Sequence, residues 1–112
     1  MTAKLYYKKS TGWEQLPINT QMLSPVIGTT VGTTAWTQQS TPDVTGYPWR
    51  ASVTYTGLTA NDYISVVFAQ EDIDKGILSN LCNSAAGVVY IYAKEKPTSP
   101  ITVATMQAWR KL

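Results

Sequence analysis

Histidine is absent from this chain of 112 residues, and only 14% of the residues are charged. Without histidine, the Ser-His-Asp and Cys-His catalytic arrangements, most zinc sites and the commonest general base are excluded. We therefore expect no enzyme activity, no metal site and no cofactor. One hydrolytic alternative remains open, because two carboxylates can hydrolyse a glycosidic bond. Its candidates are Glu71, Asp72 and Asp74, although acids in such a run are more typical of the first turn of a helix.

Cysteines and long apolar runs are scarce as well. Cys82 is the only cysteine, so no disulfide can form within the chain. No signal peptide precedes the first expected strand, and no apolar run approaches the roughly 18 residues of a membrane span. We expect a soluble chain made in a cytoplasm, with no membrane insertion. The segment 28–32 is rich in glycine but lacks the lysine of a phosphate-binding loop, and the acids at 72 and 74 lack EF-hand spacing.

The charge balance is close to neutral. Nine basic and seven acidic residues leave a formal charge of +2, and the basic residues gather toward the two ends of the chain. A nucleic-acid groove needs a denser basic stripe with interleaved aromatic residues. We therefore expect no nucleic-acid partner.

Tyrosine, tryptophan and threonine are abundant, and these residues favour strands. A chain of this length forms one domain. The composition predicts a mainly β fold, a small antiparallel β-sandwich with one short α-helix at about residues 71–82. Within residues 1–112 we expect an N-terminal hairpin over 1–18, a loop-rich segment over 19–48, and the main strands and helix over 49–110.

Hydrophobic periodicity locates the main elements. Residues 49–56 alternate strictly between apolar and polar, and Ile64, Val66 and Phe68 repeat the alternation, so both segments are predicted strands. Apolar residues at 73, 77, 78 and 81 have helical spacing, which also places Cys82 on the helix as a small buried hydrophobe. In the loop-rich segment we expect only one short strand, near Val31–Trp36.

The C-terminal third contains two β-rich runs joined by a charged turn that closes with proline, which predicts a β-hairpin. The first run, Val88–Tyr92, is apolar on both faces and needs cover on both sides, inside a sandwich or at a subunit interface. The second run changes its apolar face between Val103 and Ala104. Either a β-bulge or a strand that moves from one sheet into another environment would explain this change, and we favour the second explanation.

Several motifs occur in a characteristic order. They are Trp36, the polar strand 51–56, Gly57–Asp62 (GLTAND), Val89–Ala93 (VYIYA), Glu95–Thr98 (EKPT) and the final strand to Arg110. In this order the chain resembles the C-terminal domains of tailed-bacteriophage tail fibres and other minor virion proteins, over about residues 33–110. It departs from that family after the GLTA turn, where a regular apolar strand replaces an aspartate-rich loop.

The resemblance implies a virion structural protein that is assembled in the cytoplasm of a host bacterium, in a tail fibre or a head fibre. It implies a homo-oligomer, a trimer, with other virion proteins as partners and a host-surface polysaccharide as a possible ligand. The alternative is an architectural capsid, baseplate or head-decoration protein that binds only other virion proteins.

Two sets of residues are candidates for these roles. Sugar rings commonly stack on exposed aromatic side chains, for which Trp36, Tyr47 and Trp49 are the candidates. The competing interpretation is that Trp36 fills the sandwich and Trp49 begins a core strand. The candidates for the subunit interface are Val88, Tyr90, Tyr92, Met106 and Trp109.

Overall fold

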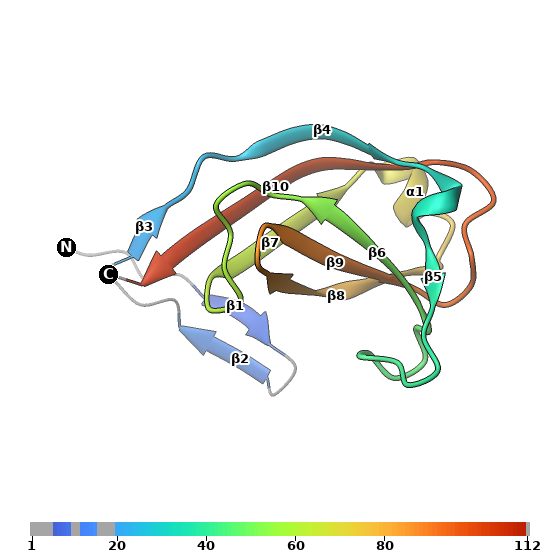
Figure 1. Cartoon of the computed structure of the whole chain (residues 1–112), viewed down its shortest axis with the longest axis horizontal. Helices are drawn as coiled ribbons and strands as arrows, with labels where there is room; N and C mark the ends of the chain where they lie inside the picture. The colour runs from blue at the N-terminus through green and yellow to red at the C-terminus, as the bar shows by residue number, and fades with distance from the viewer. Residues whose placement is uncertain (1–5, 10–11, 16–19, 112) are drawn as a thin grey trace.

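The computed structural model describes residues 6–9, 12–15 and 20–111 (Figure 1). Its strands and helices follow the chain in this order: β1 Tyr6–Lys9, β2 Gly12–Gln15, β3 Thr20–Met22, β4 Val26–Val31, the 3-10 helix η1 Thr33–Ala35, β5 Thr37–Gln38, β6 Trp49–Thr54, β7 Tyr63–Phe68, α1 Gln70–Ile73, β8 Leu78–Ala85, β9 Val88–Ala93 and β10 Ile101–Lys111.

Two antiparallel four-stranded sheets build the body of the molecule (Figure 1). The first, called here the β9 sheet, has the order β5-β6-β9-β8. The second, the β10 sheet, is centred on β10, which pairs with β7 on one edge and with β3 and β4, one after the other, on the opposite edge. Strands β1 and β2 pair with each other in a separate antiparallel ladder. The predicted mainly β fold with two packed sheets and a short helix is confirmed.

The core lies between the two sheets and follows the predicted alternation. Ala51 and Val53 on β6 are buried, whereas Ser52 and Thr54, which alternate with them, are exposed. Other fully buried side chains come from β9 and β10: Val89, Ile91, Ile101, Val103, Met106 and Ala108. Burying each large aliphatic side chain contributes about 1.5–3 kcal/mol, so this interior is the main source of stability.

The predicted hairpin between the last two strands is wrong. β9 pairs with β6 and β8, whereas the strands that pair with β10 in the described part of the chain are β3, β4 and β7 of the other sheet. The connection 94–100 therefore crosses from one sheet to the other. Pro97 in this connection is buried, and the Lys75 Nζ donates a hydrogen bond of 2.7 Å to the Ser99 Oγ. These contacts attach the crossing segment to the end of the sandwich.

The helix predicted over 71–82 is much shorter in the structure. It spans Gln70–Ile73, and residues from Leu78 onward form β8. Gly76 has a φ of +72°, a conformation that favours glycine and ends the helical path. Cys82 consequently lies on a strand, where it is half-buried and packs against the core. Burial raises the pKa of its thiol to about 11.

The change of face in the last strand is a β-bulge, so the favoured explanation is wrong. The register between β10 and β7 shifts between Val103 and Thr105, and β10 remains in one sheet along its whole length. Opposite the bulge, Gly28 on β4 has a φ of +72°. The two neighbouring strands therefore reverse their faces at the same level, which keeps apolar residues on the inner side.

The segment 19–48 contains more regular structure than expected. β3, β4 and β5 all lie in it, and the strand predicted near Val31–Trp36 is replaced by β4, which ends at Val31, and by the 3-10 helix Thr33–Ala35. Gly28 explains part of this error, because its positive φ interrupts the alternation that would reveal β4.

A buried tyrosine bridges the break between β3 and β4. Pro25 lies in this break and has no N–H to donate to β10. The Tyr55 hydroxyl donates to the Ser24 carbonyl (2.7 Å) and accepts the N–H of Ala108 (3.2 Å). Only 2% of Tyr55 is exposed. The side chain of Tyr55, which follows β6, thus satisfies one backbone group of β10 and one in the break between β3 and β4.

Candidate functional site

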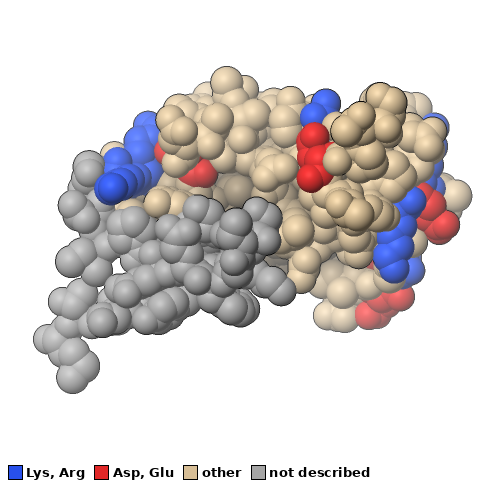
Figure 2. Space-filling model, turned by 90° about the horizontal axis from the view of Figure 1, so that it is seen from below, with Lys and Arg blue, Asp and Glu red and all other residues tan. Residues whose placement is uncertain are grey.

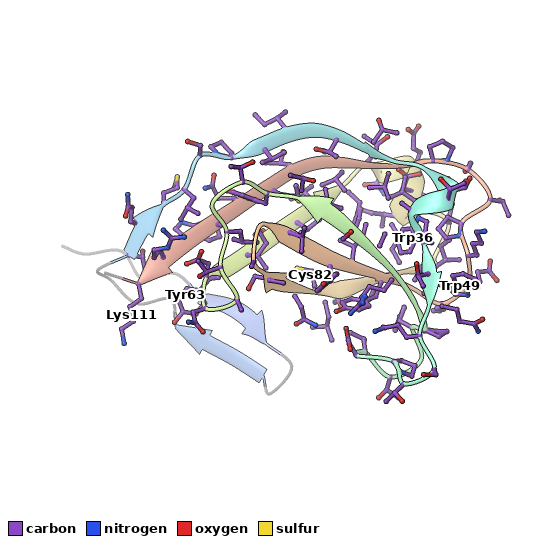
Figure 3. The ribbon with its side chains drawn as sticks, viewed as in Figure 1. Trp36, Trp49, Tyr63, Cys82 and Lys111 are labelled. Atoms are coloured by element: carbon purple, nitrogen blue, oxygen red, sulfur yellow. The ribbon has the colours of Figure 1, made fainter. Side chains whose placement is uncertain are left out.

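The three predicted sugar-binding residues do not form one exposed surface. Trp36 is buried, so its ring cannot stack on a sugar, and within the described part of the chain its indole Nε1 has no hydrogen-bond partner. Trp49 is half-buried on the core side of β6, near Trp36 at one end of the sandwich (Figure 3). The Lys96 Nζ lies 5.9 Å from the Trp49 ring centroid. Tyr47 is half-buried in a turn closed by its own N–H and the Val44 carbonyl (3.0 Å).

The five predicted interface residues also separate in the structure. Tyr92 and Met106 have no exposed surface, because the monomer itself covers them: Met106 lies in the core, and Tyr92 lies on the outer side of the β9 sheet beneath the loop that carries Asp43. Val88 and Tyr90 are half-buried on the outer side of the β9 sheet, and Trp109 is half-buried on the outer side of the β10 sheet. The second face of β9 is therefore covered largely from within the chain.

A group of polar side chains lies on the outer face of the β9 sheet. We call this group the polar cluster: Asp43, Arg50, Asn83, Tyr90 and Tyr92. The register places Arg50 of β6 beside Tyr92 of β9, and Asn83 of β8 beside Tyr90. Asp43 comes from the loop between β5 and β6, which crosses this face.

Hydrogen bonds connect the polar cluster. The Tyr92 hydroxyl donates to Asp43 Oδ2 (2.9 Å) and accepts from the Asn83 side-chain amide (2.8 Å). Arg50 Nη1 donates to the same carboxylate oxygen (3.2 Å). The guanidinium carbon of Arg50 also lies 4.2 Å from the centre of the Tyr90 ring, a cation–π distance. The loop is thereby held against the sheet.

The environment shifts two pKa values in this cluster. The hydrogen bond from Tyr92 is the main cause that lowers the pKa of Asp43, and Arg50 adds to it. Burial raises the pKa of the Tyr92 hydroxyl to about 12. Near neutral pH the cluster therefore contains a carboxylate, a guanidinium and a protonated phenol, with no net charge.

Part of the cluster is open to solvent. About one third of each charged side chain is exposed, 34% for Arg50 and 37% for Asp43. Ser52, which lies opposite Tyr90, and Asn83 are exposed beside them. The surface offers hydrogen-bond donors and acceptors next to an aromatic ring, which is the chemistry that neutral sugars need.

Sequence reasoning missed Asp43, Arg50 and Asn83 as site residues. A signal existed for Arg50, because it occupies the polar side of the strand that alternation predicted. Nothing local marks Asp43, since aspartate in a turn commonly bonds to its own backbone. Tyr90 was predicted to lie at an interface and is found next to Arg50.

Two of the three acids considered for hydrolysis, Asp72 and Asp74, make structural contacts, and Glu71 is exposed. Asp72 is buried, and its two oxygens accept the Thr102 N–H (2.7 Å) and the Lys75 Nζ (3.0 Å). Asp74 accepts a hydrogen bond of 2.8 Å from Gln70. Over residues 20–111 and the two N-terminal strands, no group of three or more acidic or cysteine side chains is arranged to hold a metal ion.

A second buried acid fixes the GLTAND loop. Asp62 accepts two hydrogen bonds from Arg110 (2.8 and 3.0 Å) and one from the Thr59 N–H (2.8 Å). The bonds from Arg110 are the main cause that lowers the pKa of Asp62. Arg110 also donates to the Gly57 carbonyl (2.7 Å). These bonds attach the GLTAND loop, one of the motifs that carry the family resemblance, to the end of β10.

Two hollows lie along the seams of the sandwich. One of about 310 Å³ lies between β4 and β6, and Thr29, Thr30, Ser52 and Thr54 contribute hydroxyl groups to its lining. The other, of about 280 Å³, lies between β7 and β8 and is mostly apolar. On the face seen in Figure 2, acidic and basic side chains lie close together at separate places, with uncharged surface between them.

Comparison with protein-family models, with curated proteins and with solved structures finds no match to this chain. Among the described residues, none of the helices is long and apolar enough to span a membrane.

Proposed function

We propose that this chain is a structural module of a bacteriophage virion that helps the particle attach to a host-surface polysaccharide. The polar cluster is the sugar-contacting surface in this proposal. The observation that carries it is the Arg50–Tyr90 stack at 4.2 Å, beside the exposed Ser52 and Asn83. The virion role itself is supported by the order of sequence motifs.

The chemistry of the cluster favours an uncharged sugar. Arg50 uses Nη1 for Asp43 and retains further N–H groups that can donate to hydroxyls, while the carboxylate can accept from them. Because the two charges compensate each other, an anionic polymer gains little attraction. The hydrogen-bonded loop needs little reordering when a ligand arrives, which reduces the entropic cost of binding.

Single contacts of this kind are weak, so the proposal includes self-association. Several copies on one particle would present several polar clusters to one polymer, and the effective concentration of the second site strengthens attachment. The trimer implied by the resemblance remains a prediction. The proposal includes no enzymatic step, cofactor, nucleic acid or membrane insertion, and the virion is the proposed location.

One observation favours the architectural alternative. Asp43, Tyr92 and Asn83 direct their hydrogen bonds at one another, so part of the cluster serves to hold the loop. In that case the chain would bind only other virion proteins, in a capsid, baseplate or head decoration.

Binding to an array of purified bacterial polysaccharides separates these two functions. We expect the native protein to bind at least one neutral polysaccharide, and Arg50→Ala and Tyr90→Ala each to weaken that binding at least tenfold. Thr54→Ala, on the same sheet face but outside the cluster, is the matched control and should bind normally. Absence of any glycan binding, or equal binding by all four proteins, would overturn the sugar-binding role.

A further inference from the structure

The outer face of the β10 sheet carries rows of side chains set by the strand register. Thr105 pairs with Ile27 on one side and with Val67 on the other. Four residues further along β10, Trp109 pairs with Met22 and Tyr63. We call this surface the uncharged face, and it consists of Met22, Ile27, Tyr63, Ser65, Val67, Thr105, Gln107 and Trp109.

The apolar side chains of this face are far more exposed than a monomer requires. Ile27 is 74% exposed, Met22 is 62% exposed and Val67 is 51% exposed. Ile27 and Val67 flank Thr105 in one row, and Met22 lies beside Trp109 in the other row, so all three belong to one sheet face. Contiguous apolar surface of this kind marks an interaction site in a soluble protein.

The face also lacks charge. Segments 20–31, 63–69 and 101–109 contain no Asp, Glu, Lys or Arg. Between the two apolar rows, the side-chain amide of Gln107 donates to the Leu23 carbonyl (2.7 Å) and to the Ala108 carbonyl (3.2 Å). The glutamine therefore lies along the sheet and leaves the surface flat. Depletion of charged residues is the compositional mark of an interface core.

We propose that the uncharged face binds a second copy of this chain, face to face, around a two-fold axis near Gln107. In a two-fold contact, residue i meets residue j and residue j meets residue i. Thr105 and Trp109 are equally distant from Gln107, so each large Trp109 ring would lie over the small Thr105 of the other copy. Both copies then place a Trp109 ring over a Thr105 side chain, and these two contacts lie about 14 Å apart.

The charges beyond the two ends of the face fit the same arrangement. Lys111 is exposed at the end of β10, where the C-terminus lies (Figure 1). The hydrogen bond from the Thr102 N–H to Asp72 places α1 next to the start of β10, at the opposite end of the face. Glu71 and Asp74 beside it are exposed. A two-fold axis between them brings the basic end of one copy near the acidic end of the other. A parallel arrangement would place like charges together.

The size of the face predicts a weak contact. The face runs from Thr105 to Trp109, which is about 17 Å of β10, and it is three strands wide, about 14 Å. The footprint is therefore about 240 Å² on each copy, or about 500 Å² in total, below the roughly 1,000 Å² of a stable specific interface. We expect a dimer that forms and dissociates with concentration. This inference does not rest on the proposed function, and its two-fold pairing is an alternative to the trimer that the resemblance implies.

Sedimentation and light scattering over a dilution series test the pairing. We expect the mass to rise toward twice the chain mass of 12.3 kDa as concentration increases. Val67→Lys should remain a monomer, because pairing would bury its charge. Thr54→Lys, an exposed residue of the outer β9 sheet face, is the matched control and should dimerise normally. Circular dichroism checks that both variants are folded.

A charge-reversal series tests the two-fold geometry. Lys111→Glu should weaken the dimer severalfold, and adding Glu71→Lys and Asp74→Lys should restore it. A native protein that is monomeric at millimolar concentration, a stable three-chain mass, or a Val67→Lys protein that pairs normally would overturn the proposal. Glycan binding measured on the same variants keeps this outcome separate from the attachment role.

Discussion

The two outer faces of this sandwich use their side chains in opposite ways. On the β9 sheet, polar groups bond to one another and hold a loop of the same chain against the face. On the β10 sheet, the segments 20–31, 63–69 and 101–109 contain no charged residue, and isoleucine, valine and methionine extend into solvent. One face is completed within the monomer, and the other is left for a partner. The two faces differ in hydropathy and also in the placement of charged residues, and both properties are needed to distinguish them.

The energetics explain why one fold can combine both faces. An ion pair that is about one third exposed contributes about 1 kcal/mol or less, so the Asp43–Arg50 contact positions the loop more than it stabilises the protein. Apolar side chains that stay exposed contribute little to folding of the monomer. Stability comes mainly from the shared core, so the residues on both outer faces can be selected for binding at little cost to folding.

The largest expected effect is a loss of stability when the Tyr55 hydroxyl, on the inner side of the β10 sheet, is removed. In Tyr55→Phe, the Ser24 carbonyl and the Ala108 N–H lose their hydrogen-bond partner. Leaving two backbone groups unsatisfied should lower the free energy of unfolding by about 3 kcal/mol. Urea denaturation measures this loss. Tyr90→Phe keeps its ring beneath Arg50 and should change stability by less than about 0.5 kcal/mol. Similar losses in both variants would show that the Tyr55 hydroxyl does not hold the β10 sheet.

An intermediate loss of stability should arise from the polar cluster at high pH. The pKa of Tyr92 is about 12 in the folded protein, against 10.0 as its ordinary value, so the folded state holds this proton more tightly than the unfolded state. Its contribution to stability is present below pH 10 and should be lost as the pH rises toward 12, by less than about 2 kcal/mol. Thermal unfolding between pH 8 and pH 12 measures the slope.

Tyr92→Phe is the control for that slope. Tyr55 also has a raised pKa, because it is buried, so part of the alkaline loss should remain in the variant. The difference between the two proteins isolates Tyr92. Identical slopes would mean that the polar cluster does not control the titration of this hydroxyl.

The smallest expected effect is on the uncharged face itself. Ile27→Val removes one methylene from a side chain that is 74% exposed, and it should change the free energy of unfolding by less than about 0.3 kcal/mol in dilute protein. The same change at Ile91, which is fully buried, should cost about 0.5–1.5 kcal/mol. Chemical denaturation at two protein concentrations gives both values. Equal costs in the dilute monomer would show that Ile27 is covered by its own chain.

The alternation of apolar and polar residues in 49–56 and in 63–68 predicted β6 and β7 correctly, because each strand buries one face against the same core. The spacing of Ile73, Ile77, Leu78 and Leu81 fits a helix equally well, and only pairing with β9 decides that residues 78–85 form a strand. The false hairpin has the same origin, since a proline-rich turn does not reveal which sheet the next strand will join.

The candidate site was harder to predict, because its parts meet across long separations. Asp43 and Tyr92 bond over 49 positions in the chain, and no local motif links them. The aromatic residues at 36, 47 and 49 were predicted to bind a sugar because they lie in or beside a loop-rich segment, yet Trp36 is buried in the core. Exposure of a given aromatic side chain is a property of the folded packing, and alternation marks only the faces of single strands.

The central position of β10 constrains the order in which the sandwich can form. β3, β4 and β7 all pair with it, and the Gln107 side chain bonds to a carbonyl 84 residues earlier in the chain. β5, β6, β8 and β9 all precede residue 94, so the β9 sheet can form before β10 has been synthesised, whereas β3, β4 and β7 lack their central strand until then. The β10 sheet also depends on pairs between residues far apart in the sequence, and such contacts slow folding. We therefore expect the β10 sheet to close after the β9 sheet.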